Sequence, residues 1–270
     1  CNDLVYKVHP YRWPTIGLSV DDIKNASHED IKSFFAQHYA VNNLILCVSG
    51  HIEFEKAVAL TEKWFGDFAP ANIPVRNLPQ EPVQTEQRFM SVKREVPQNV
   101  LTMMYHMCGR CDADYQVCDM LSDVLSNGMS SRFYRNVLVK SGLFTELDAS
   151  VSGTYDPGLF IVRARLADGV SFDKAKDAID AELADFIRNG ATAYEIEKCG
   201  NKYESTRLFD MITYEKKGVK LCQYELLGDA ADINKEVGKY RCITQDRLMN
   251  VAKNLLNPDN CSILYYGPDA

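Results

Sequence analysis

The sequence contains one pattern of helix, turn and strand twice, and the two copies are separated by 217 residues. Residues 38–50 read HYAVNNLILCVSG and residues 255–267 read LLNPDNCSILYYG, so Asn43 aligns with Asn260 and Gly50 with Gly267 without gaps. Two capped helices followed by strands can also look alike by chance. We interpret the pattern as two copies of one unit. The first copy is expected to lack its front part, which would begin well upstream of Cys1.

Composition and charge are those of an ordinary globular protein. Hydrophobic residues make up 46% and charged residues 25% of the 270 residues, a length typical of about two domains. A net charge of −7 without a Lys/Arg run argues against nucleic acid and anionic membrane surfaces as partners. No apolar segment approaches the roughly 18 to 20 residues that cross a bilayer. We therefore expect no nucleic-acid partner and no membrane span.

The cysteines bear on the compartment. Nine cysteines, an odd number, are scattered along the chain. This usage is more typical of reduced thiols than of a disulfide scaffold. A cytoplasmic location is therefore favoured.

The first part of the chain is expected to form helix, strand and helix. Ser27 is a helix cap, and the apolar spacing after it predicts a helix to about Tyr39. The continuous apolar run at 44–50 predicts a central strand, and residues 53–66 predict a second helix. Four prolines within residues 69–84 are typical of an extended linker. We place the domain boundary in that linker.

The second part mixes strands and helices. Two strands are expected within 88–107, a helix from about Ala113, and a strand hairpin within 143–166. Capped amphipathic helices are expected at 171–190 and 244–257, with a long helical tract at 193–227 between them. The last strand, 261–266, ends this part in the same way as the first part ends.

Several short motifs in order resemble the pitrilysin/insulinase family of zinc metallopeptidases. They are HPYRWPTIG, WFGDF, GMSSRFYRNVLVKSGLF and ITQDRLMNVAKNLLNPDNCSILYYGP. The resemblance implies an α+β fold of repeated lobes, each a mostly antiparallel sheet backed by helices on one side. It makes residues 1–68 the C-terminal part of a first lobe, 69–84 the inter-lobe linker, and 85–270 a complete second, non-catalytic lobe.

The resemblance also says where the metal of active family members lies. They carry H-x-x-E-H in the first lobe, with two His ligands and a Glu that acts as general base. None of the five histidines of this chain begins that motif. We expect no cofactor in this segment, zinc in the full-length protein or a partner subunit, and no activity of the segment alone.

The second lobe of active relatives contributes an Arg and a Tyr, seven residues apart, that hold the substrate. The family pattern puts Leu138 in place of the Arg and Thr145 in place of the Tyr. Leucine cannot donate a hydrogen bond and the Thr hydroxyl is shorter than a Tyr phenol, so we assign no catalytic residue. Arg135 would substitute only if the helix presented a different face.

One further cluster has the side chains of a metal site. His106, Cys108 and Cys111 include a Cys-x-x-Cys spacing that zinc or thiol exchange can use. The second Cys pair of a zinc ribbon is absent. We interpret the three as structural or incidental thiols and a histidine, with a metal site as the alternative.

These observations lead to two hypotheses about function. In the first, the chain is the C-terminal segment of a zinc metalloendopeptidase and helps to enclose peptide substrates. In the second, it is a non-catalytic scaffold or partner subunit with the same fold. The expected partners are the missing N-terminal lobe, peptide substrates, and a related subunit in a homo- or heterodimer.

Overall fold

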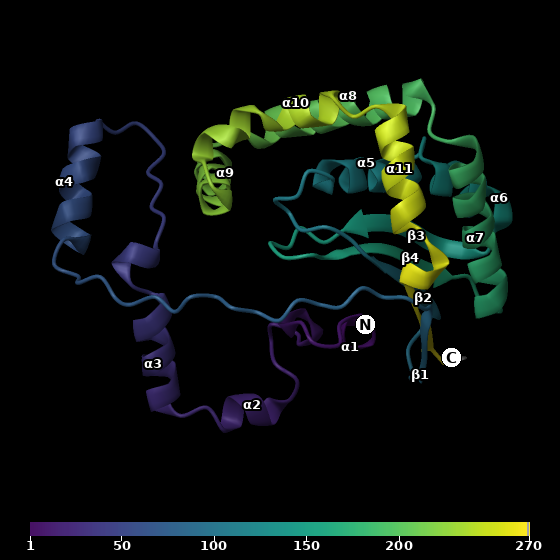
Figure 1. The fold of residues 1–270 in the computed structure, drawn as a ribbon, viewed down its shortest axis with the longest axis horizontal. Coiled ribbons are helices and arrows are strands. Elements are labelled where there is room, and N and C mark those ends of the chain that lie inside the picture. Colours follow the sequence, from purple (N-terminus) through teal and green to yellow (C-terminus); the bar gives the residue numbers. More distant parts are fainter. Residues whose placement is uncertain (269) are drawn as a thin grey trace. The chain divides into compact units, whose positions relative to one another are not determined.

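The computed structural model describes residues 1–268 and 270. The chain forms two compact units (Figure 1). The sheet unit consists of residues 1–7, 81–205 and 236–270, and the helix unit of residues 8–80 and 206–235. Residues 1–7 thus group with the sheet unit and residues 206–235 with the helix unit. The lobe boundaries expected from the sequence, with 1–68 and 85–270 joined by the linker 69–84, stay a prediction.

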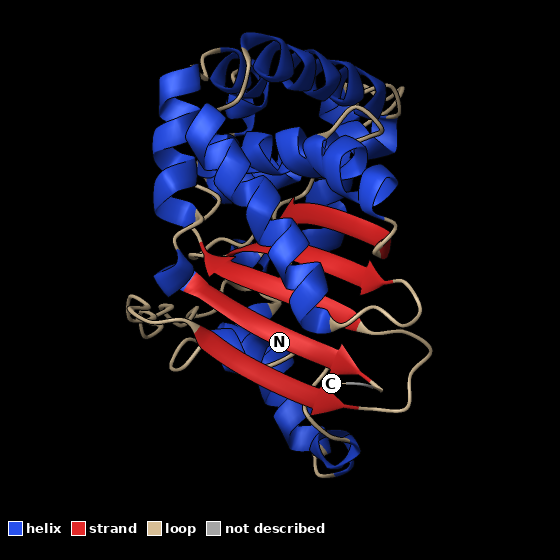
Figure 2. Ribbon diagram, turned by 90° about the vertical axis from the view of Figure 1, so that its right-hand side faces the viewer, coloured by secondary structure: helices blue, strands red, loops and turns tan. Residues whose placement is uncertain are grey.

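The sheet unit is built on five strands in the order β1-β5-β2-β4-β3 (Figure 2). Only the β1–β5 pair is parallel, and the other pairs are antiparallel. The α+β architecture expected from the sequence is therefore confirmed. Its elements are α1 (Asn2–Val5), β1 (Arg88–Lys93), β2 (Val100–His106), α5 (Tyr115–Ser126), η3 (Phe133–Leu138), α6 (Val139–Ser141), β3 (Phe144–Val151), β4 (Leu159–Leu166), α7 (Phe172–Asn189), the first part of α8 (Ala193–Asp210), α10 (Glu236–Arg241), α11 (Gln245–Leu255), η5 (Pro258–Asn260) and β5 (Cys261–Gly267).

One hydrophobic core lies between this sheet and its helices. Alternate residues of a strand point to one face, and Leu101 and Met103 of β2 both belong to the core. Leu121 of α5, Ile179 of α7 and Leu248 of α11 close it from the helix side. Sequence periodicity predicted these helices and strands correctly because burial on one face is what creates the pattern.

The opposite face of the sheet has different neighbours. His106 lies on this face, and its ring makes an edge contact with the ring of Tyr6, at 5.5 Å between centroids. Arg88 donates a hydrogen bond to the backbone oxygen of Val5. The segment around α1 therefore packs against the sheet face that the core helices do not cover.

The helix unit contains helices and extended segments. No helix among residues 1–268 and 270 is long and apolar enough to cross a membrane. The elements of the helix unit are η1 (Pro10–Arg12), α2 (Val20–Lys24), α3 (His28–His38), η2 (Val41–Asn43), α4 (Phe54–Phe65), the end of α8, α9 (Tyr214–Leu227) and η4 (Ala230–Asn234).

The two copies of the sequence repeat have the same local structure. Helices α3 and α11 each have 11 residues, and a hydroxyl caps each of them, from Ser27 and from Thr244. A 3-10 turn follows each helix, η2 in one copy and η5 in the other. The turn asparagines donate equivalent hydrogen bonds, Asn43 to the backbone oxygen of His38 at 2.8 Å and Asn260 to that of Leu255 at 2.9 Å. Helix and turn form in both copies because their bonds are local.

The strand expected at 44–50 is not formed, and this expectation was wrong for the chain in this structure. The equivalent strand β5 pairs with β1 on one side and β2 on the other, whereas residues 44–49 belong to no strand. Leu46 is 55% exposed, while its counterpart Ile263 is 1% exposed. A strand needs neighbours to take up its backbone hydrogen bonds, and the described residues supply none to this segment.

Candidate functional site

The helix that carries Leu138 contains a π-helical segment. It consists of η3, a π-helix, followed by the last turn α6, and it ends at Gly142 with a φ of 65°. The amide of Val139 donates to the oxygen of Tyr134, five residues back. Such bulges occur often at functional positions.

Leu138 and Thr145 are the positions that the sequence comparison is expected to align with the family's Arg and Tyr. They take part in packing and in a strand irregularity. Leu138 is partly buried and packs against the hydrophobic core. Thr145 is exposed on β3 between Phe144 and Glu146, where the register of the β3–β4 pair shifts. Its hydroxyl donates to the oxygen of Arg165 at 3.5 Å. Neither side chain offers a cationic or phenolic donor to a substrate.

Arg135 does not take the place of Leu138. Its side chain is exposed, whereas Leu138 lies against the core. In a π-helix the turn is wider than in an α-helix, so residues three apart do not lie one above the other. The two side chains therefore point in different directions.

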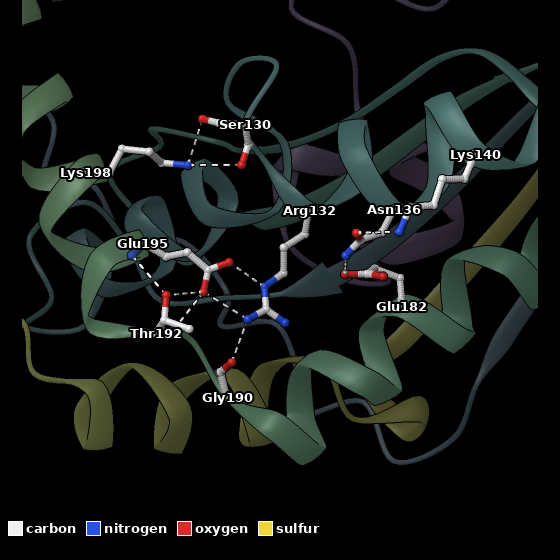
Figure 3. A network of polar contacts seen from close by, with 9 residues as sticks. All are labelled: Ser130, Arg132, Asn136, Lys140, Glu182, Gly190, Thr192, Glu195 and Lys198. Carbon is white, nitrogen blue, oxygen red and sulfur yellow. Dashed lines mark hydrogen bonds and ion pairs between the residues drawn. The ribbon is translucent and has the colours of Figure 1, made fainter.

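Arg132 fixes the start of this helix (Figure 3). Its Nε donates to Glu195 Oε1 at 2.7 Å, and its Nη2 donates to Glu195 Oε2 at 2.9 Å and to the oxygen of Gly190 at 2.7 Å. The guanidinium also lies over the ring of Phe186, at 4.9 Å from the centroid. A bidentate pair of this kind fixes both partners in direction as well as distance. Arg132 thus joins the helix to the turn between α7 and α8.

Glu195 is held from both sides. The amide and hydroxyl of Thr192 donate to its Oε2 at 2.7 and 3.0 Å. Burial by itself would raise the pKa of Glu195, but the hydrogen bonds from Arg132 and Thr192 outweigh it and lower the pKa to about 2. This carboxylate stays ionised and serves as an anchor.

Weaker contacts extend the network along the helix (Figure 3). Asn136 donates to Glu182 Oε1 at 3.0 Å, and Lys140 donates to Asn136 Oδ1 at 3.4 Å. Lys198 of α8 donates to the hydroxyl of Ser130 at 3.1 Å. The motif around residues 128–143 is thus a structural junction.

The three residues of the alternative metal site are not assembled into one. His106 is partly buried at the end of β2, and burial lowers its pKa. Cys108 contacts Cys118, and a hydrogen bond from the Cys118 thiol lowers the pKa of Cys108. Cys111 lies exposed in the next turn. Across residues 1–268 and 270, no three His, Cys, Asp or Glu side chains are grouped so that they could hold a metal ion. The side chains present do not fit a zinc site.

A buried polar cluster that the sequence patterns did not single out lies between α5 and α10. Tyr240 donates to Asp119. Glu236, 1% exposed, accepts from Arg110 at 3.0 Å and from Gln116 at 3.2 Å. Gln116 and Glu236 are 120 residues apart in the sequence, so no local pattern could reveal their contact.

Asp123 of α5 provides a test of the electrostatics beside this cluster. Burial raises the pKa of Asp123 from 3.8 to about 6, against a hydrogen bond from Asn127 and the charges of Lys202 and Lys198. The folded protein thus binds this proton more tightly than the unfolded chain does, and stability should rise as pH falls from about 6 toward 3.8. We expect Asp123→Asn to be more stable than the wild type by about 1 kcal/mol at neutral pH. The difference should shrink on acidification in unfolding measurements at several pH values; a constant difference would refute this explanation.

Comparison with known families matches residues 25–203 to the model described as the peptidase M16 inactive domain. The match covers more than half of the chain. The chain belongs to the peptidase M16 family. The resemblance to pitrilysin and insulinase, seen first in the motifs, is thereby confirmed.

Individual M16 relatives agree with this assignment. The zinc protease PqqE of Helicobacter pylori is 27% identical over 198 residues, which cover 72% of this chain and 44% of that protein. The crystal structure of a protease from Helicobacter pylori matches with a TM-score of 0.91 at 22% identity, over 99% of this chain and 65% of that chain. A chain of complex III2 from Candida albicans matches with a TM-score of 0.81 at 14% identity, over 99% of this chain and 66% of that one.

The chain corresponds to only part of the length of its relatives. The chain spans 44% and 54% of the length of two curated relatives that are named zinc proteases. The structural likenesses, at 22% identity or less, show the fold. Zinc is therefore plausible for full-length M16 proteins of this kind, while the described residues form no metal site.

Proposed function

We propose that this chain is the C-terminal portion of an M16 zinc metalloendopeptidase, in which it helps to enclose peptide substrates and supplies no catalytic group. Zinc and the general base would come from the N-terminal lobe of the same protein or from a partner subunit. The observation that carries the proposal is the match of residues 25–203 to the peptidase M16 inactive domain, together with relatives that are named zinc proteases. The lack of a catalytic group is inferred from Leu138 and Thr145, which we align with the family's substrate-holding Arg and Tyr. One packs into the core and the other lies exposed at a strand irregularity.

The part of this sheet face that β3 and β4 form supports a role as a wall, while the α1 segment packs near β1 and the end of β2. On β3 and β4 this face carries paired charges: Arg165 bonds Glu146 at 2.6 Å, and Arg163 lies opposite Asp148 in the register. Charged side chains are seldom fully buried, so a surface that carries several of them is normally in contact with water. A face of this kind suits the lining of an aqueous chamber and not a contact with a second apolar layer.

Exposed apolar side chains in the helix unit indicate that a partner lobe covers it. The repeat counterparts of buried residues are exposed in it: Phe35 is 60% exposed where Ala252 is 0%, and Ile31 is 59% exposed where Leu248 is 0%. By the pattern of the second copy, residues 44–50 would lie between a parallel strand and an antiparallel strand of the missing lobe. Apolar surface left open in this way is expected to be covered in the assembled protein.

A scaffold or partner subunit with the same fold is the second candidate. The loss of the Arg and Tyr favours it, because a chain that has no contact with the scissile bond retains no role in chemistry. A chain of complex III2 from Candida albicans has the same fold, as reported above. Whether the N-terminal lobe carries an intact H-x-x-E-H motif distinguishes the two candidates.

The proposal makes a direct prediction for the isolated chain. We expect the isolated chain with added zinc to cleave a quenched fluorescent peptide library no faster than a control treated with chelator. Leu138→Arg combined with Thr145→Tyr should remain inactive as well, because the described residues form no metal site. Zinc-dependent cleavage by the isolated chain would refute the proposal.

A further inference from the structure

Two thiols far apart in the sequence meet within the helix unit. Cys47 lies in the extended segment 44–49, and Cys222 lies in α9. The two side chains interact directly, and the sulfur of Cys222 also lies 4.0 Å from the backbone oxygen of Ile45. Both are free and partly exposed. The contact thus joins the first copy of the repeat to a helix 175 residues later.

The surface of α9 makes room for this contact. Gly218 lies one turn before Cys222, so both face the same side of the helix. A β-carbon at Gly218 would lie 3.6 Å from the sulfur of Cys47 and 3.8 Å from the β-carbon of Ser49. The missing side chain at 218 therefore lets segment 44–49 lie close against α9.

Small molecules can reach the thiols. Segment 44–49 and α9 line a groove of about 700 Å³, and both cysteines are part of its wall. Its other lining residues include Leu46, Val219 and Leu226. A peptide-sized disulfide reagent can therefore approach Cys47 or Cys222 from solvent.

We propose that Cys47 and Cys222 form a redox-responsive disulfide that ties segment 44–49 to α9. The oxidant is a low-molecular-weight disulfide such as oxidised glutathione. The thiolate of Cys222 attacks one glutathione sulfur, breaks the S–S bond and releases one glutathione thiolate. The thiolate of Cys47 then attacks the Cys222 sulfur and releases the second glutathione. The two cysteines lose two electrons and two protons, and two molecules of reduced glutathione are formed.

Two physical consequences follow. Burial and the neighbouring Cys222 raise the pKa of Cys47, so the closing step should be faster at mildly alkaline pH, where more thiolate is present. The disulfide would close a loop of the chain that contains most of the sheet unit and about half of the helix unit. A cross-link across so long a loop restricts the unfolded chain strongly.

The test is oxidation of the 270-residue chain with oxidised glutathione, followed by alkylation and peptide mapping without reduction. We expect a cross-linked peptide pair containing residues 47 and 222, a mass lower by two hydrogens, and loss of alkylation at both cysteines. Reduction should restore both. Cys108 and Cys118, which are also in contact, can form their own disulfide, and the map separates the two pairs.

Serine variants complete the test. Cys47→Ser and Cys222→Ser should each abolish the cross-linked pair and leave the remaining cysteine as a mixed disulfide with glutathione. Cys242→Ser is the matched control, because Cys242 is an exposed thiol directly after α10. This variant should leave the pair unchanged. Oxidation that gives only mixed disulfides at Cys47 and Cys222, or pairs them with other cysteines, would overturn the proposal.

Discussion

Replacing Ile263 by Asp should unfold the sheet unit, whereas the same change at its repeat counterpart, Leu46, should leave the fold of the isolated chain unchanged. Ile263 is 1% exposed in β5 and belongs to the core. An unpaired carboxylate at such a position costs about 4 kcal/mol or more, a large part of the stability of a typical domain. Leu46 is 55% exposed, so a carboxylate there stays in contact with water.

Denaturant unfolding followed by circular dichroism measures both effects. Ile263→Val and Leu46→Val serve as matched controls, and Ile263→Val should lower the free energy of unfolding by only about 1 kcal/mol. Equal destabilisation by Ile263→Asp and Leu46→Asp would show that residues 44–50 are already part of a core. If the proposed N-terminal lobe covers residues 44–50, Leu46→Asp should become as damaging in the assembled protein as Ile263→Asp, because that lobe would bury the carboxylate.

Arg132→Met should lower the free energy of unfolding by about 3 kcal/mol. The side chains of Arg132 and Glu195 are only 12% and 17% exposed, and removing one partner leaves the other charge poorly solvated. The loss of the bond to Gly190 adds to this, since the carbonyl then lacks its donor.

The double variant Arg132→Met/Glu195→Gln separates the contribution of the Arg132–Glu195 ion pair from that of the other contacts of Arg132. It should be less destabilised than the sum of the single variants, because neither leaves a lone charge. Lys198→Met, at the exposed contact with Ser130, is the control and should cost less than about 1 kcal/mol. If Arg132→Met costs no more than this control, the proposed junction between the helix and the α7–α8 turn is wrong.

Local signals account for the elements that the sequence predicted well. Ser27, Ser171 and Thr244 each cap a helix in the structure, as expected from their position before an apolar stripe. These features depend on bonds within one turn of the chain. The core strands β2 and β4 were recognisable for a related reason, since their burial leaves apolar residues in the sequence itself.

Long-range contacts account for what the sequence did not reveal. Segment 44–50 has the composition of a strand, but strand formation depends on neighbours that composition does not specify. Cys108 is in contact with Cys118 of α5, a contact that the Cys-x-x-Cys spacing of the sequence does not indicate. The π-helical segment before Leu138 and the cluster around Glu236 likewise arise from tertiary packing. None of these carries a local pattern.

Reconstitution of peptidase activity tests the proposed function most directly. The chain would be combined with the polypeptide encoded immediately upstream of Cys1, and cleavage of a quenched fluorescent peptide would be followed with zinc and with chelator. We expect neither part to cleave alone and the combined protein to cleave in a zinc-dependent manner, with the rate reduced by Leu46→Asp. Cleavage by this chain alone, or by the upstream part at the same rate without it, would contradict the proposed role of this chain as a non-catalytic wall.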